Sequence, residues 1–148
     1  MVNNGELVRV ILADDDEDDC MLFADVAQEL KAPMRLTCVT NGIELHRSLE
    51  VGNNLPDIIF LDLNMPLKNG MDCLRDIRRD TRFMHLPVII FSTSAQQDTV
   101  LLAFETGADM YVKKPSSIVR LRDILNKILS IHADKALTRQ PWDRFLID

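Results

Sequence analysis

The sequence contains no long apolar stretch. Its apolar runs are far shorter than the roughly 20 residues that a helix needs to cross a bilayer. The first residues, MVNNGELVRV, lack the basic segment followed by an apolar one that marks a secretory leader. We therefore expect a cytoplasmic protein that does not associate with a membrane.

Basic residues are in the minority. Lys and Arg number 17 against 23 Asp and Glu, which gives a formal net charge of -6. A surface that binds nucleic acid needs clustered Lys and Arg to replace the counterions along the phosphates. The charge balance therefore argues against direct DNA binding.

Cysteine is scarce as well. Cys20, Cys38 and Cys73 are odd in number, far apart and embedded in apolar periodic segments, and none belongs to a C-x-x-C pair. These features argue against a disulfide framework. We expect three reduced thiols in the hydrophobic core.

The chain does contain enough apolar material for one core. Hydrophobic residues make up 47% and charged residues 27% of the 148 positions. Such a chain suits one compact domain and leaves almost no room for a second.

Short β-type apolar runs alternate with longer segments of helical periodicity. The predicted strands cover 7–13, 35–40, 57–62, 87–92 and 110–114. The predicted helices are one with apolar residues from 20 to 30, one capped by Asn41, then 70–79, 96–106 and one that begins after Ser116 or Ser117. This alternation is typical of right-handed βαβ units, which place a parallel sheet between two layers of helices. We predict a doubly wound α/β fold.

Polar side chains gather where the predicted strands end. Asp14 and Asp15 follow the first strand, Asp62 ends the third, Ser92 ends the fourth and Lys114 ends the fifth. The carboxyl ends of parallel strands share one edge of the sheet, where ligands usually bind. Three carboxylates meeting there would repel one another unless a cation joined them. Without a cluster of His or Cys, the oxygen ligands favour Mg²⁺, with Mn²⁺ as the alternative, over Zn²⁺.

Four further acids, at positions 16–19, follow Asp15 directly. They fall at the start of the next helix, where the helix dipole favours negative charge. A calcium loop of the EF-hand type fits poorly, because Asp19 stands where the sharp turn needs glycine and a strand precedes the run. We interpret these four acids mainly as a helix start.

Four segments together carry a resemblance to a known family. They are ILADDDEDD, FLDLNMPLKNG, PVIIFSTSA and YVKKP, in this order along the chain. In this combination the chain resembles the receiver domain of two-component response regulators, of the stand-alone, single-domain type. The resemblance covers residues 7–131 and leaves 132–148 as a C-terminal extension. It implies a flavodoxin-like sheet of five parallel strands in the order 2-1-3-4-5, with five helices.

The resemblance also implies a chemistry centred on Asp62. This residue would accept a phosphoryl group from a histidine kinase or a phosphotransfer protein. Asp14, Asp15 and Asp62 would hold Mg²⁺ together with the backbone carbonyl of Asn64. Slow loss of the phosphoryl group would be the only reaction that the protein performs by itself.

Three further residues match positions with assigned roles in the family. Lys114 matches the lysine that offsets the charge of the phosphoryl group. Ser92 matches a hydroxyl that binds the new phosphoryl group, and Tyr111 matches the aromatic residue whose rotamer changes on activation. The resemblance therefore predicts a conformational signal that a downstream protein target reads.

Two other functions share parts of this pattern. An aspartyl-phosphate hydrolase of the haloacid dehalogenase type uses a D-x-D pair, whose second Asp acts as a general acid. Here Asn64 holds that second position and cannot donate a proton to a leaving group. A pseudo-receiver that only binds partners would ordinarily lack one of the acids or the lysine, and this chain has all of them.

The last sixteen residues contain an aromatic cluster but no output domain. Trp142 and Phe145 lie in a segment that packs either on its own domain or on a second subunit. Both placements stay open from the sequence. We predict a homodimer formed through the face of the last helix and assisted by this segment.

Overall fold

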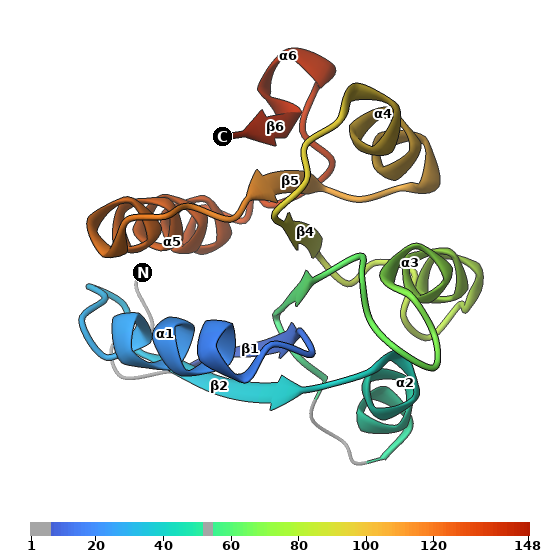
Figure 1. Ribbon diagram of the computed structural model, residues 1–148, viewed down its shortest axis with the longest axis horizontal. Coiled ribbons are helices and arrows are strands. Elements are labelled where there is room, and N and C mark those ends of the chain that lie inside the picture. The colour runs from blue at the N-terminus through green and yellow to red at the C-terminus, as the bar shows by residue number, and fades with distance from the viewer. Residues whose placement is uncertain (1–6, 52–54) are drawn as a thin grey trace.

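The computed structural model describes residues 7–51 and 55–148, which form one parallel sheet between two layers of helices (Figure 1). The sheet has six strands in the order β2-β1-β3-β4-β5-β6. The strands are β1 (Val8–Ala13), β2 (Met34–Val39), β3 (Ile58–Leu61), β4 (Val88–Ser92), β5 (Met110–Lys113) and β6 (Leu146–Ile147). The helices are α1 (Glu17–Ala27), α2 (Gly42–Glu50), α3 (Gly70–Arg79), α4 (Gln97–Thr106), α5 (Ile118–Ala133) and α6 (Trp142–Phe145). The predicted doubly wound α/β fold is confirmed.

Helices cover both faces of the sheet. Figure 1 shows α1 and α5 on one side and α2, α3 and α4 on the other. Side chains of β3 alternate between the two cores, with Ile58 and Phe60 in one and Ile59 and Leu61 in the other. All four are buried, as expected for a strand that is apolar throughout and covered on both faces.

Polar side chains define where the helices begin. Asp16 caps α1 by accepting hydrogen bonds from the backbone N–H groups of Asp18 and Asp19. Asn41 caps α2 as predicted, and Ser117 rather than Ser116 caps α5. The acidic run therefore does start a helix, and α1 begins at Glu17 after β1 has ended at Ala13. Among the described residues, no helix combines the length and apolar character needed to cross a bilayer.

The C-terminal segment packs on its own domain and adds a sixth strand. β6 pairs in parallel with β5, with Tyr111 opposite Leu146 and Val112 opposite Ile147. Phe145 is completely buried. The predicted order 2-1-3-4-5 is therefore extended by one strand and one short helix. A two-residue strand after a four-residue helix is too short to produce a periodic pattern in the sequence.

The three cysteines are free but differ in burial. Cys73 is buried and Cys20 half-buried, whereas Cys38 is exposed. The prediction of a core position is wrong for Cys38, because β2 is an edge strand and three of its six side chains are exposed.

Candidate functional site

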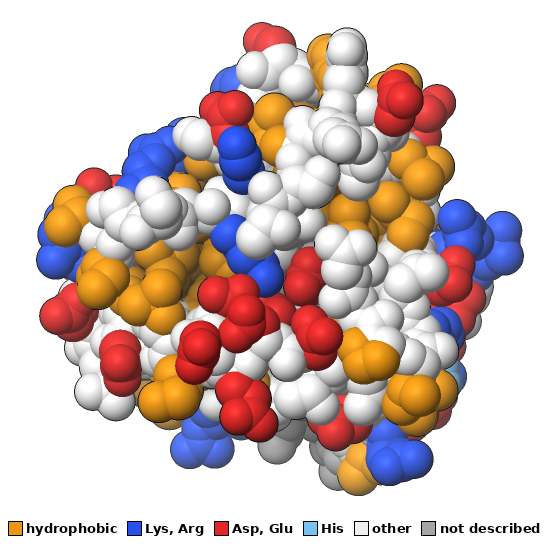
Figure 2. Space-filling model, viewed as in Figure 1, with side chains coloured by type: hydrophobic (Ala, Val, Ile, Leu, Met, Phe, Trp, Pro, Cys, Tyr) orange, Lys and Arg blue, Asp and Glu red, His pale blue; other side chains and the backbone are white. Residues whose placement is uncertain are grey.

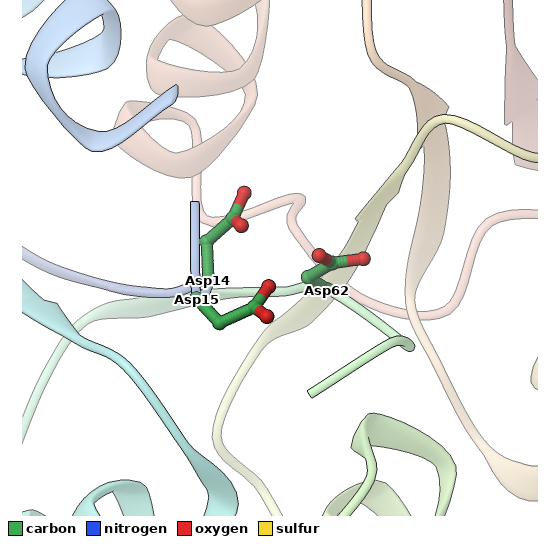
Figure 3. A group of neighbouring side chains, drawn as sticks. All are labelled: Asp14, Asp15 and Asp62. Carbon is green, nitrogen blue, oxygen red and sulfur yellow. The ribbon is translucent and has the colours of Figure 1, made fainter. Parts of the chain in front are cut away.

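The ends of β1 and β3 bring three carboxylates together. Asp14, Asp15 and Asp62 each offer one oxygen, and these oxygens all lie within 4.8 Å of one another. The strands are neighbours, and the backbone N–H of Asp62 donates to the carbonyl oxygen of Ala13 at 2.9 Å. Figure 3 shows the side chain of Asp15 pointing toward Asp62, with the side chain of Asp14 beside them. Asp14 and Asp62 are buried, and Asp15 is exposed.

Backbone hydrogen bonds hold the two buried carboxylates in place. Oδ1 of Asp14 accepts from the backbone N–H of Asp16 at 3.0 Å. Oδ1 of Asp62 accepts from the N–H of Asn64 at 3.3 Å. The side chain of Asn64 itself is exposed. Each carboxylate thus keeps its second oxygen for the centre of the site.

Lys114 supplies the positive charge beside these acids. Its Nζ lies 2.7 Å from Oδ2 of Asp14, 2.8 Å from Oδ2 of Asp19 and 3.4 Å from Oδ2 of Asp62. Its backbone N–H donates to the carbonyl oxygen of Ser92 at 2.8 Å, which ties the end of β5 to the end of β4. The neighbouring Lys113 is exposed, so Lys114 is the lysine that points inward.

One buried oxygen of the site makes no hydrogen bond. Oδ2 of Asp14 contacts the Lys114 ammonium as an ion pair, but the geometry is not that of a hydrogen bond with any described residue. A buried carboxylate oxygen in this state has an unused coordination position. The site therefore fits a small cation bound by hard oxygen ligands.

Burial and charge shift the protonation equilibria of the site. Burial raises the pKa of Asp62 to about 6; Lys114 opposes this shift and the charge of Asp14 adds to it. Burial lowers the pKa of Lys114, but its contacts with Asp14 and Asp19 outweigh that effect and raise it above the ordinary value. Lys114 is therefore charged, and Asp62 is a carboxylate whose charge the metal-free protein offsets only in part.

Ser92 and Tyr111 come from β4 and β5, the two strands that follow β3 in the sheet. Ser92 is completely buried at the end of β4, and its Oγ accepts from the backbone N–H of Ser94 at 3.4 Å. Tyr111 is also completely buried, and its hydroxyl donates to the carbonyl oxygen of Ser94 at 2.5 Å. Its ring packs at an angle of 60° against Phe145, with 6.4 Å between the ring centroids. The loop after β4 thus connects the site to the C-terminal segment.

Sequence reasoning missed the contact that Asp19 makes. The sequence analysis assigned this acid to the helix start, whereas the structure pairs it with Lys114. The cap at Asp16 places Asp19 in the first turn of α1, from which its carboxylate contacts Lys114. Figure 2 shows the resulting group of acidic side chains, with basic side chains beside it.

The chain belongs to the response regulator receiver family. The family model described as the response regulator receiver domain matches residues 10–126. The resemblance drawn from the four sequence segments is therefore confirmed.

Individual relatives are similar to the chain over different lengths. Chemotaxis protein CheY of Pseudomonas aeruginosa is 38% identical over 72 residues, which is 49% of this chain and 58% of the relative. Response regulator Rcp1 of Synechocystis is 26% identical over 129 residues, which is 84% of this chain and 86% of Rcp1. The crystal structure of the Mn²⁺-bound form of Rcp1 superposes with a TM-score of 0.75 at 24% identity, covering 85% of this chain and 94% of that one. The chain spans just over half the length of several other curated relatives.

Proposed function

We propose that this chain is a stand-alone response regulator that accepts a phosphoryl group on Asp62. One observation carries the proposal: the buried carboxylate of Asp62 lies between two other acids and a lysine at the carboxyl edge of the sheet. Rcp1, which is named a response regulator and matches over most of both chains, supports the stand-alone form.

The chemistry follows from how the side chains are placed. An oxygen of Asp62 attacks the phosphorus atom of the donor, the new O–P bond forms, and the bond from phosphorus to the donor breaks. The Lys114 ammonium, 3.4 Å from Asp62, offsets the charge on the transferred group. The donor is a phosphohistidine of a histidine kinase or of a phosphotransfer protein.

The donor set suits Mg²⁺, or Mn²⁺ in its place. The carboxylates of Asp14, Asp15 and Asp62 and the backbone carbonyl of Asn64 would hold the ion. The clustering of the three carboxylates supports this assignment, as does Oδ2 of Asp14, which is buried and makes no hydrogen bond to a described residue. When bound, the ion supplies positive charge to the phosphoryl oxygens.

Signalling then uses the loop after β4. The Ser92 hydroxyl donates to an oxygen of the new phosphoryl group, which draws the loop toward Asp62. The backbone carbonyl of Ser94, which accepts a hydrogen bond from the Tyr111 hydroxyl, moves with the loop. The ring of Tyr111 is then free to shift against Phe145. Phosphorylation therefore changes the population of conformations on the face formed by α4, α5 and the C-terminal segment, whose β6 covers the edge of β5.

A downstream protein and a second copy of the chain would bind on this face. Exposed apolar side chains lie on both helices, Leu101 and Leu102 on α4 and Ile118 and Val119 on α5, and Trp142 is partly exposed nearby. These side chains are suited to a protein partner rather than to DNA. We place the protein in the cytoplasm, with no enzymatic activity beyond slow loss of its own phosphoryl group.

Beryllofluoride, a stable phosphoryl analogue, tests the proposal directly. With Mg²⁺ present, the wild type binds the analogue and forms more dimer in sedimentation, whereas Asp62→Asn does neither. Failure of the wild type to bind Mg²⁺ and the analogue contradicts the proposed site. Binding of both with a persistent monomer at high concentration rejects only the dimer.

A further inference from the structure

A hollow runs along edge strand β2 on the face that α2 covers. Its volume is about 590 Å³, and its floor includes Ile11, Thr37 and Val39. Beside it lies α2, which is nine residues long and ends at Glu50. The hollow extends along β2 from Arg35 to Val39, and its lining includes none of the three clustered carboxylates Asp14, Asp15 and Asp62.

Three arginines from three elements line this hollow. They are Arg9 of β1, Arg35 of β2 and Arg47 of α2. Arg9 and Arg35 are direct partners across the two strands, so their side chains stand next to each other on one face. Like charges in this position repel and destabilise the pairing. The neighbouring positions of Arg9 and Arg35 therefore do not stabilise the sheet when no ligand is bound.

No described residue neutralises these three guanidinium groups. Arg75, Arg78 and Arg82, in contrast, each pair with a carboxylate. Arg9 is half-buried. Its backbone N–H donates a hydrogen bond to a side chain, but its guanidinium group makes none to the side chain of a described residue.

Among the described residues of the lining, Glu44 alone carries a carboxylate. Its Oε1 accepts from the backbone N–H of Thr40 at 3.0 Å and so is already engaged. Hydroxyls of Thr37 and Ser48 add neutral hydrogen-bond donors to the same surface. The hollow is therefore locally positive although the chain has a net charge of -6, and its charge favours the binding of an anion.

We propose that this hollow binds a small molecule that carries at least two phosphate groups. A guanidinium group binds phosphate oxygens through two parallel hydrogen bonds, and three such groups match more than one phosphate. The volume of about 590 Å³ lies within the range of small-molecule sites and exceeds what inorganic phosphate needs. The apolar floor suits the remainder of the ligand. This site is separate from Asp62 and does not depend on the proposed phosphorylation.

Calorimetric titration of the full chain without divalent metal tests the site, with inorganic phosphate, pyrophosphate and ATP as probes. We expect pyrophosphate or ATP to bind at least tenfold more tightly than phosphate. The double variant Arg35→Gln/Arg47→Gln, both exposed positions, should weaken that binding at least tenfold. The control Arg79→Gln/Arg144→Gln removes the same charge at exposed positions outside the hollow's lining and should leave binding unchanged.

Three results would overturn the proposal. They are no binding of pyrophosphate and ATP, equal weakening in both double variants, and binding of vesicles with anionic lipids in place of the soluble phosphates. Unchanged thermal unfolding of the two double variants without ligand shows that a loss of binding does not come from loss of the fold.

Discussion

Lys114 and Asp14 form the shortest ion pair of the site, with 2.7 Å between Nζ and Oδ2. The carboxylate is completely buried and the lysine side chain is only 10% exposed. In this position the Lys114 ammonium group also contacts Oδ2 of Asp62. Lys114 thus offsets the charge of these carboxylates, and under the proposed function it would also contact the phosphoryl group.

Replacing this lysine should affect metal binding and phosphorylation in opposite directions. Lys114→Met removes a cation that repels Mg²⁺, so the affinity for Mg²⁺ should rise several-fold. The same change removes the charge that stabilises phosphoryl transfer, so uptake from acetyl phosphate should slow about tenfold or more. Calorimetry and intact mass measure the two effects. Lys113→Met is the matched control because its side chain is exposed, and equal effects in both variants would contradict the assigned role.

Asp62 should lower the stability of the metal-free protein. Burial raises the pKa of Asp62 to about 6, above the ordinary 3.8, so the charged form opposes folding. The destabilisation by the charged form of Asp62 is complete above pH 6 and decreases as the pH falls toward 4. Asp62→Asn should therefore raise the free energy of unfolding by about 1–2 kcal/mol at pH 7.5, with a smaller gain at pH 4.5.

Urea unfolding at the two pH values, without Mg²⁺, measures this difference. Asp123→Asn, at an exposed position of α5, serves as the control and should change little at either pH. A gain for Asp62→Asn that is the same at both pH values would show that the buried charge of Asp62 is not its cause.

The C-terminal segment should report the state of the site. Trp142 packs against Phe104 and Phe145, with centroid distances of 5.1 Å and 6.2 Å, and Phe145 contacts Tyr111. Beryllofluoride should therefore change the fluorescence of Trp142 in the wild type. Tyr111→Phe keeps the ring but loses the hydrogen bond to the loop, so its response should be smaller. An identical fluorescence change in the wild type and in Tyr111→Phe would show that the hydrogen bond of Tyr111 does not couple the site to Trp142.

Gly70 permits the close approach of α3 to Asp62. Its backbone N–H donates to the carbonyl oxygen of Leu63 at 3.0 Å, and an added Cβ would overlap the backbone of Asp62. Gly70→Ala should destabilise the protein by about 1–3 kcal/mol and weaken Mg²⁺ binding. Asp72→Ala, exposed in the same helix turn, should change either quantity little. Wild-type behaviour of Gly70→Ala would contradict the packing at this point.

Much of the fold could be predicted because its patterns are local. The apolar runs that became β3 and β4 are typical of strands covered on both faces, and the alternation with helices determines a parallel sheet. A parallel sheet brings its carboxyl ends to one edge, which is why three acids and a lysine could be expected to meet.

The remaining features depend on tertiary contacts that leave no periodic pattern. β6 is two residues long and follows directly after Phe145, which is buried against α4 and β5. The pairing of Asp19 with Lys114 joins residues 95 positions apart. The neighbouring positions of Arg9 and Arg35 follow from the register of β1 and β2, which the sequence does not reveal.

Mass spectrometry after incubation with acetyl phosphate and Mg²⁺ tests the central claim most directly. The wild type should gain the mass of one phosphoryl group, and the gain should disappear in Asp62→Asn and when Mg²⁺ is removed by EDTA. Peptide mapping should then locate the group on Asp62. A wild type that stays unmodified while it binds Mg²⁺, or a phosphoryl group that persists in Asp62→Asn, would contradict the account.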